Sequence, residues 1–299
     1  MKTLLINSTK LSGNTITAHS RNAIILSKEL GIKLISTKEE IEALNVNNYK
    51  KFIVSGSGFY PETAAIEKEI RKNENATLIW LNNEYSTSPN SEYARLMKDI
   101  ESFSISNIKT KYDGLITNLN TLIYNTPNPV INKKYDCIYY GTYRPGRRLY
   151  FQKYLQDNFI YLSSSAKNIK KYKFLAGANA LWCGSLSWEK QRETLNLFKY
   201  SLYIEDEHTH NNYNYLANRF YECLMCNVVQ FFDINCKNTI EQSGIEFDDY
   251  FYVSNLEELK DKIKNDDFEK SLKFQKKWNI TAEKERESVI NAIKEVLEL

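Results

Sequence analysis

The sequence predicts an α/β protein made of two doubly wound, Rossmann-like domains that face a cleft. Short β-rich runs alternate with helical stretches along the whole chain, which is the pattern of parallel sheets with crossover helices. An Asn- and Pro-rich stretch at 125–134 separates two such series. The length of 299 residues suits two domains of ordinary size. We therefore predict an N-terminal domain at 1–128 and a C-terminal domain at 129–299.

Five apolar runs form the first predicted sheet. They are TLLIN (3–7), IKLIS (32–36), KFIVSGS (51–57), TLIWLN (77–82) and DGLITNL (113–119). Helices are expected at 16–31, which ends in Gly31, and at 62–73, which follows Pro61. Glycine commonly stops a helix and proline commonly opens one, so both positions support these bounds.

Six further runs form the second predicted sheet. They are YDCIYYG (135–141), NFIYLS (158–163), YKFLAG (172–177), SLYIED (201–206), NVVQFFD (227–233) and YFYVS (250–254). One helix is expected at 213–225, and helical stretches at 256–278 and 281–299 close the chain. Ligands of doubly wound sheets bind at the carboxyl ends of the strands, so polar residues that follow strands are the site candidates.

Composition narrows the class of protein. The apolar fraction of 42% is enough for a real core, and a net charge of +3 permits a local basic face without a histone-like excess. No apolar run approaches the roughly 18 residues of a membrane span. Five cysteines, an odd number, indicate reduced thiols in a cytoplasmic protein. Cys223 and Cys226 form a CxxC without the second pair that a zinc site needs.

Two charged groups interrupt the apolar segment NRFYECLMCNVVQFFD (218–233). Arg219 and Glu222 are three residues apart, so they share one face of the expected helix. The start of that helix lies at the carboxyl edge of the second sheet, where helix amides favour phosphate. A guanidinium there can hold phosphate oxygens and a carboxylate can accept from ribose hydroxyls. The alternative is that the two residues pair with each other.

A second basic cluster follows the first strand of the second sheet. In YYGTYRPGRRLYFQKYL (139–155), Arg144, Arg147 and Arg148 lie at the turn between strand and helix. Gly141 allows the backbone to approach a ligand closely. Three arginines at a strand end predict a polyanion such as a diphosphate, and a solvated surface patch is the alternative. The acidic run from Glu205 to Glu207 is expected to cap and solvate a strand end rather than bind metal.

The second half resembles the donor domain of GT-B glycosyltransferases. NRFYECLMCNVVQFFD is similar to their acidic, helix-then-strand motif, and YGTYRPGR is similar to the loop that opens that domain. The resemblance covers about 130–255, and the first domain matches only in general layout. Two positions depart from the pattern, because Asn227 replaces the usual glycine and Val228 the proline that often follows.

The resemblance implies a donor site for a nucleotide sugar, such as a UDP-sugar, with no tightly bound cofactor and no metal. It assigns Glu222 to the ribose and Arg144, Arg147 and Arg219 to the diphosphate. Five further residues complete the expected donor site: Gly141, Thr142, His210, Tyr215 and Asn218.

The first domain is expected to bind the acceptor and supply a base. His19 follows the loop NSTKLSGNT, and an imidazole suits proton transfer near neutral pH. Glu84, just past a strand end beside Trp80, is the competing base. A packed histidine and a helix-capping glutamate are the alternatives. The acceptor-binding candidates are the loop residues Ser12, Gly13, Gly58 and Tyr60.

Size, mildly basic charge and a composition rich in Asn, Lys, Ile and Tyr favour a phage enzyme that glycosylates double-stranded DNA. It resembles those that attach glucose or arabinose to 5-hydroxymethylpyrimidines such as 5-hydroxymethylcytosine. Its place of action would be the host cytoplasm, with no membrane partner. One alternative is a bacterial glycosyltransferase for surface polysaccharide or spore protein. Another is a non-catalytic GT-B protein that binds nucleotides or DNA.

Overall fold

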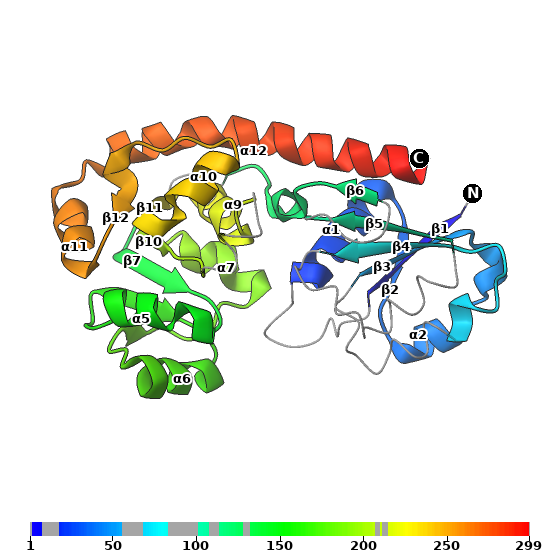
Figure 1. The fold of residues 1–299 in the computed structure, drawn as a ribbon, viewed down its shortest axis with the longest axis horizontal. Coiled ribbons are helices and arrows are strands. Elements are labelled where there is room, and N and C mark those ends of the chain that lie inside the picture. Colours follow the sequence, from blue (N-terminus) through cyan, green and yellow to red (C-terminus); the bar gives the residue numbers. More distant parts are fainter. Residues whose placement is uncertain are drawn as a thin grey trace. The chain divides into compact units, whose positions relative to one another are not determined.

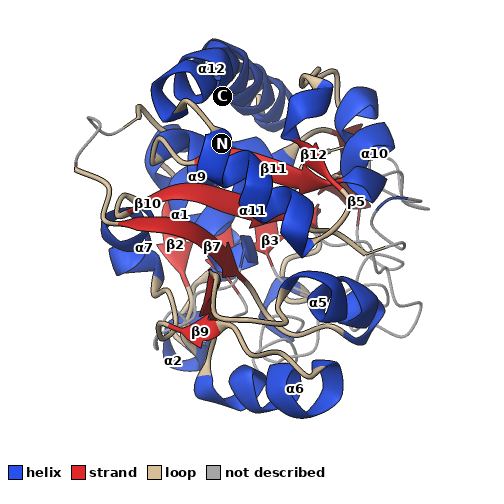
Figure 2. Cartoon of the chain, turned by 90° about the vertical axis from the view of Figure 1, so that its left-hand side faces the viewer, coloured by secondary structure: helices blue, strands red, loops and turns tan. Residues whose placement is uncertain are grey.

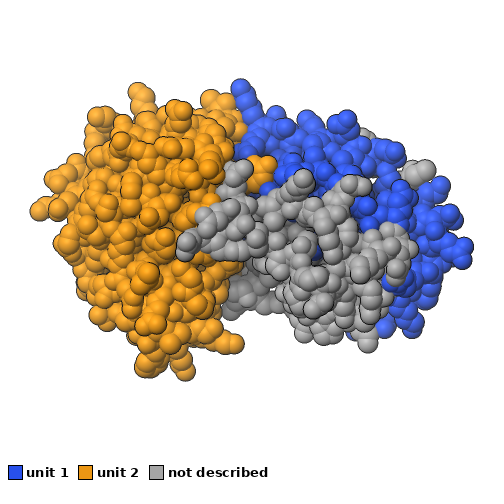
Figure 3. Space-filling model, viewed as in Figure 1, with its two compact units in different colours: residues 1–123, 284–299 blue, residues 124–283 orange. Residues whose placement is uncertain are grey.

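The computed structural model describes residues 2–7, 18–55, 68–82, 101–107, 114–127, 132–206, 210 and 215–298. The chain divides into two compact units (Figure 3). Unit 1 contains residues 1–123 and 284–299, and unit 2 contains residues 124–283. Each unit is built on one six-stranded sheet.

The sheet of unit 1 is parallel throughout, with strand order β2-β1-β3-β4-β5-β6 (Figure 1). Its elements are β1 (Thr3–Asn7), α1 (Ala18–Leu30), β2 (Lys33–Ile35), α2 (Lys38–Glu42), β3 (Lys51–Ser55), β4 (Thr77–Asn82), β5 (Glu101–Ser106) and β6 (Gly114–Ile116), with single 3-10 turns at Val46–Asn48 and Leu119–Ile123. Successive side chains on a strand point to opposite faces, so both faces of this sheet are apolar. On β1, Leu4 and Ile6 pack in one core cluster and Leu5 in the other.

The sheet of unit 2 is also parallel, with strand order β12-β11-β10-β7-β8-β9. Figure 2 shows β11, β10 and β7 side by side in red. The strands are β7 (Tyr135–Tyr140), β8 (Ile160–Ser163), β9 (Leu181–Trp182), β10 (Phe198–Tyr203), β11 (Val229–Asp233) and β12 (Tyr252–Val253). The helices are α5 (Arg148–Tyr154), α6 (Ala166–Ala176), α7 (Trp188–Leu195), α9 (Asn218–Met225), α10 (Lys237–Gln242), α11 (Leu256–Asn265) and α12 (Phe268–Leu297), with 3-10 turns at Pro145–Arg147, Ile234–Cys236 and Asp249–Phe251.

The direction of winding reverses between β7 and β10. From β7 the chain moves outward through β8 and β9, and it then returns to the other side of β7 as β10. Ligands of open α/β sheets bind outside the carboxyl ends of the strands at such a reversal point. The topology of unit 2 therefore directs attention to the residues after β7 and β10. The prediction of two doubly wound parallel sheets is confirmed.

Helix α12 changes the predicted domain boundaries. The sequence assigned all of 129–299 to the second domain, whereas residues 284–299 belong to unit 1 and the boundary between the units falls after Ile123. The reason is apolar burial, because Val289, Ile290 and Ile293 are part of a core cluster of unit 1. The helical end of the chain, expected at 256–278 and 281–299, is confirmed, but its break lies elsewhere. The break falls earlier, between α11 and α12, and α12 is continuous.

Two strand predictions differ from the structure. YKFLAG is not a strand, because most of it lies in α6, whose buried residues Ile169, Tyr172 and Ala176 recur at helical spacing. The third strand of that series is the short β9. In unit 1 the serine-rich β5, ESFSIS, was not predicted, because it lacks the continuous apolar character of its neighbours. Residues 62–67 of the helix expected at 62–73 lie outside the described residues, and of the rest, 68–70 are helical.

Across the described residues, no helix combines the length and apolarity required to cross a bilayer.

Candidate functional site

A buried cluster of charges occupies the carboxyl ends of β7 and β10. Arg147 follows β7, Glu205 and Asp206 follow β10, and Arg219 lies in the first turn of α9. The Glu205 carboxylate bridges the two guanidiniums, with Oε2 accepting from Arg147 Nη2 and Oε1 accepting from Arg219 Nη2. Arg147 Nε also donates to Asp206 Oδ2 at 3.2 Å, and Arg219 Nη2 donates to the Ile204 carbonyl at 2.9 Å.

Burial makes this cluster strongly coupled. The side chains of Glu205 and Arg147 are 2% and 6% exposed. Burial alone would raise the pKa of Glu205, but the charges of Arg147 and Arg219, with a smaller effect from Arg144, hold that pKa below its usual range. Burial opposes the charge of Arg219, yet the Glu205 carboxylate outweighs it and raises the pKa of Arg219. All three groups are therefore charged near neutral pH.

Arg219 and Glu222, which share one helix face in the sequence, do not pair with each other. Arg219 turns to Glu205, while Glu222 Oε2 accepts a hydrogen bond from the Tyr140 hydroxyl at 2.8 Å. The Glu222 carboxylate is buried at the end of β7 and not on a helix surface. The two charges have separate partners on neighbouring strands, so the ion pair considered from the sequence is absent.

Gly141 brings the backbone close to Arg219. Its φ of +153° is a conformation that L side chains rarely adopt, and a Cβ at this position would lie 3.1 Å from Arg219 Nη1. The Gly141 carbonyl accepts from Ser164 Oγ at 2.6 Å and from the Tyr172 hydroxyl at 3.3 Å. The loop after β7 is thus held against both the guanidinium and the start of α6.

The N-terminus of α9 has no side-chain cap. Ala217 occupies the N-cap position, and no side chain there accepts from the first helical amides. Uncapped amides at a helix start are ready donors for an anion. The other end is closed by Asn227, whose φ of +50° is left-handed, with the Val228 amide donating to the Cys223 carbonyl at 3.0 Å. Asparagine is the usual substitute for glycine there, which explains the departure from the family pattern.

Three residues predicted to bind the donor carry buried polar atoms without a hydrogen-bond partner among the described residues. These atoms are His210 Nε2, Asn218 Oδ1 and Arg219 Nε. The His210 ring is oriented by Thr239 Oγ1, which lies 2.8 Å from Nδ1, and its amide donates to the Asp206 carbonyl at 3.1 Å. An unsatisfied buried donor or acceptor costs about 1–3 kcal/mol. Polar ligand atoms at this edge would remove that cost.

The remaining predicted donor residues are more exposed. Arg144 and Thr142 lie in the loop after β7 with exposed side chains, and the Arg144 side chain makes no hydrogen bond or ion pair with any described residue. Tyr215 is half-buried just before α9. Arg147 is almost fully buried and already paired. Arg219 is also paired, but its side chain is 14% exposed, against 6% for Arg147.

Most predicted acceptor and base residues lie outside the described part of the chain. These residues are Ser12, Gly13, Gly58, Tyr60 and Glu84. His19 is in the first turn of α1, but its side chain is not described. Their predicted roles stay predictions.

Sequence reasoning missed the role of Glu205 and of Tyr140. Glu205 was expected to cap or solvate a strand end, and instead it is a buried bridge between two arginines. The available signal was its position, because a carboxylate that directly follows a buried strand at the winding reversal faces the arginines of the neighbouring loop. Tyr140, read only as part of a strand, holds Glu222.

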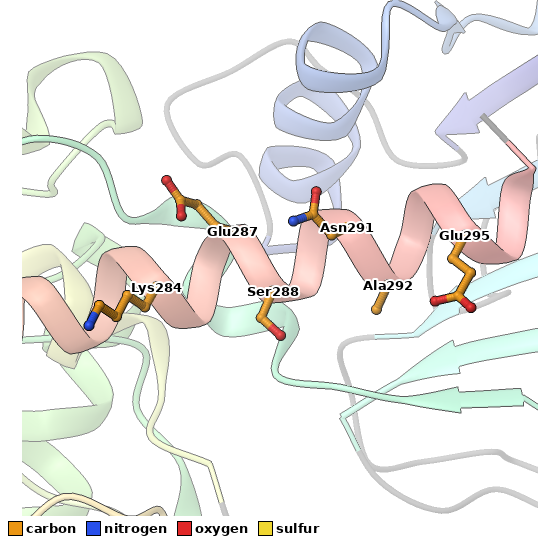
Figure 4. A pocket seen from close by; sticks show the side chains of 6 residues that line it. All are labelled: Lys284, Glu287, Ser288, Asn291, Ala292 and Glu295. Carbon is orange, nitrogen blue, oxygen red and sulfur yellow. The ribbon is translucent and has the colours of Figure 1, made fainter.

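A depression of about 520 Å³ lies on α12, along residues that belong to unit 1 (Figure 4). Six residues of that one helix line it: Lys284, Glu287, Ser288, Asn291, Ala292 and Glu295. Side chains from a single helix face cannot surround a ligand, so the chemistry argues for the strand ends of unit 2 instead. Within the described residues, no group of three or more His, Cys, Asp or Glu side chains is placed to hold a metal ion.

Comparison with solved structures supports the fold. A crystal structure of T4 phage BGT in complex with its UDP-glucose substrate superposes with a TM-score of 0.74 at 20% identity, covering 100% of both chains. A structure of the DNA-modifying enzyme β-glucosyltransferase gives a TM-score of 0.73 at 20% identity, again over 100% of both chains. An α-glucosyltransferase in complex with UDP-glucose and DNA containing an abasic site gives 0.53 at 12% identity, covering 98% of this chain and 95% of that one.

The sequence itself matches no protein-family profile and no curated protein. The likeness is therefore one of three-dimensional structure. It extends over the whole chain and includes both sheets. The chain has the two-domain α/β fold of T4 phage β-glucosyltransferase, which is the GT-B fold expected from the sequence.

Proposed function

We propose that this chain is a glycosyltransferase that moves a sugar from a nucleoside-diphosphate sugar, such as UDP-glucose, to the hydroxymethyl group of a modified pyrimidine in DNA. The main support for binding of the sugar donor is that Arg219, Glu222 and Gly141 come together where the winding of the sheet in unit 2 reverses. The fold supports the acceptor half, because the neighbours with this fold include enzymes whose structures contain UDP-glucose or DNA.

The donor would lie across the carboxyl ends of β7 and β10. Arg219 and the exposed Arg144 would contact the diphosphate, together with the uncapped amides of α9. Glu222, fixed by Tyr140, would accept from the ribose hydroxyls. His210 Nε2 and Asn218 Oδ1 would be satisfied by further polar atoms of the donor. Gly141 would allow the loop backbone to approach the phosphates.

This arrangement suits sugar transfer. Breaking the bond between sugar and phosphate builds positive charge on the sugar ring and negative charge on the departing diphosphate. Fixed guanidiniums aimed at the diphosphate stabilise that charge more in the transition state than in the ground state. The acceptor hydroxyl must lose a proton, for which His19 and Glu84 are the proposed bases. Phage DNA as acceptor would place the reaction in the host cytoplasm.

Calorimetric titration with UDP tests the donor half. Arg219→Met should weaken UDP binding about 10- to 100-fold, because a hydrogen bond to a charged group contributes about 1.5–3 kcal/mol. Lys199→Gln is the matched control, since Lys199 lies near the start of β10, at the opposite end of the strand, and pairs only loosely with Asp136 at 3.7 Å. Equal loss in both variants, or none in Arg219→Met, would reject the assigned site.

Sugar transfer itself is tested on DNA. The protein is incubated with UDP-glucose and either 5-hydroxymethylcytosine DNA or unmodified DNA of the same sequence, and the products are digested to nucleosides for mass analysis. We expect one added hexose on the hydroxymethylated nucleoside alone. Parallel reactions with EDTA and with Mn²⁺ test the metal-independent mechanism. No mass shift with any nucleotide sugar would reject the DNA acceptor.

A further inference from the structure

One face of α6 carries an unusual combination of charge and apolar exposure. Four residues, here called the α6 face, form it: Lys167, Lys170, Lys171 and Phe174. Their spacing of i, i+3, i+4 and i+7 places them along one side of the helix. The opposite side is buried through Ile169, Tyr172 and Ala176.

The charges of the α6 face are not compensated locally. Helix α6 contains no acidic residue, and none of the three lysines makes an ion pair with a described residue. Like charges at i, i+3 and i, i+4 repel each other and lower the stability of a helix. A polyanion bound to this face would remove that repulsion. The Phe174 side chain is 83% exposed within the stripe.

The α6 face belongs to the helix that supports the candidate donor site. Its N-cap Ser165 comes two residues after the end of β8, and the Tyr172 hydroxyl donates to the Gly141 carbonyl at 3.3 Å. Figures 1 and 2 show α5 and α6 next to each other within unit 2. A polyanion held on the α6 face would therefore lie on the opposite side of this helix from the loop that approaches the sugar donor, about one helix diameter (roughly 10–12 Å) away.

We propose that the α6 face docks the sugar-phosphate backbone of the DNA acceptor, an inference that rests on the proposed function. The eight residues from Lys167 to Phe174 span about 10 Å along the helix axis, or about three base-pair steps of DNA. Lysine ammoniums on flexible stems contact successive phosphates, and the Phe174 ring packs against a sugar or base. A bilayer is less well matched, because interfacial helices present a broad apolar face and this stripe contains one aromatic ring.

Salt-dependent binding to a plain duplex tests the proposal. The α6 variant replaces Lys167, Lys170 and Lys171 by glutamine. The matched control replaces the exposed α12 residues Lys270, Lys273 and Lys276 by glutamine, so both variants reduce the net charge from +3 to zero. Fluorescence anisotropy over a range of salt gives the slope of log K against log salt. We expect the α6 variant to be shallower by about 2.7, at about 0.9 per lost phosphate contact, and the control to be unchanged.

The aromatic contact is tested separately. Phe174→Ala should lower DNA affinity about five-fold at every salt concentration, the lower end of the range for an aromatic contact with nucleic acid. Ile280→Ala removes a similarly exposed apolar side chain from α12 and should have no effect. Circular dichroism confirms that each variant is folded, and unchanged UDP affinity confirms that the donor site is intact.

The outcomes separate this inference from the proposed function. If the α6 variant and the control lose the same slope, or neither loses any, the α6 face is not a DNA surface, whether or not sugar is transferred. If α6-dependent DNA binding is found but hydroxymethylated DNA receives no sugar, the surface stands and the proposed activity fails. Loss of binding to anionic vesicles in the α6 variant, without loss of DNA slope, would replace DNA by a lipid surface and overturn the inference.

Discussion

Replacing Glu205 by glutamine removes the charge that holds two arginines together while keeping the side-chain shape. In the wild type the carboxylate is buried and accepts from both Arg147 and Arg219. Glutamine retains one acceptor oxygen but places an amide donor against the second guanidinium. Arg147 keeps the Asp206 carboxylate at 3.2 Å, whereas Arg219 keeps the Ile204 carbonyl at 2.9 Å and its contacts with the Tyr139 and Tyr203 rings, but no described carboxylate.

The expected loss in the free energy of unfolding is about 3–5 kcal/mol at neutral pH, the range for removing one partner of a buried ion pair. Asp206→Asn is the matched comparison, because within the described part of the chain Asp206 pairs with one guanidinium and is more exposed than Glu205, and we expect a smaller loss of about 1–2 kcal/mol. Adding Arg219→Met to Glu205→Gln removes the guanidinium that has lost its carboxylate partner and should restore part of the stability.

Chemical denaturation measures these differences, with repeats at lower pH. The pKa of Glu205 is lowered in the folded protein, so its contribution is present above the unfolded value of about 4.3 and is lost as pH falls through the folded value. The difference between wild type and Glu205→Gln should therefore be full at neutral pH and shrink in acid. UDP should stabilise the variant as well, because its phosphates can pair with Arg219.

Two results would refute this reasoning. A loss of stability below about 0.5 kcal/mol in Glu205→Gln would mean that the bridge contributes nothing that a neutral amide cannot. A double variant with Arg219→Met that is less stable than Glu205→Gln alone would mean that packing of Arg219, and not charge balance, governs the cluster.

Three further predictions follow from single positions. Gly141→Ala should lower the free energy of unfolding by about 1–3 kcal/mol and weaken UDP binding, because φ is positive there and the new Cβ would lie 3.1 Å from Arg219. Gly146→Ala is the control for the same denaturation and titration assays. It should be tolerated, because its Cβ would lie 3.5 Å from Asp206. Asn227→Ala should lower the free energy of unfolding by about 1 kcal/mol and Asn227→Gly should not, because φ is +50° at this position. Equal losses in the two variants would contradict the left-handed cap. Burial lowers the pKa of Lys133 to about 8, so between about pH 8 and pH 10.4 the unfolded chain holds a proton that the folded chain has released, and the free energy of unfolding rises with pH. Denaturation of Lys133→Met over this pH range should show a smaller rise. A pH profile identical to that of the wild type would contradict the prediction.

The candidate site was partly accessible from the sequence because strand ends are predictable in a doubly wound sheet. Arg219, Glu222 and Gly141 were identified by their positions after buried strands, and the structure brings them to one edge. Which charge pairs with which could not be predicted. Sequence spacing puts Arg219 beside Glu222, but the side chain turns to Glu205, fourteen residues earlier in the chain.

The α6 segment illustrates the same limit in the fold. A six-residue apolar run such as YKFLAG fits a strand and a buried helix equally well, and only packing selects between them. In the structure Tyr172 lies on the buried side of α6. Its hydroxyl donates to the carbonyl of Gly141, which is 31 residues earlier in the chain, in the loop after β7. The lysine stripe on the other side of the helix became apparent only once the helical spacing was known.

The sequence alone determined the alternation of strands and helices, and with it two parallel sheets with ligand sites at their carboxyl edges, because apolar periodicity is a local property of the chain. Tertiary structure decided the rest. It assigned residues 284–299 to unit 1, placed a carboxylate between two arginines and separated Arg219 from Glu222. Each of these depends on burial and on charges brought together from distant segments, and neither quantity can be read from local spacing.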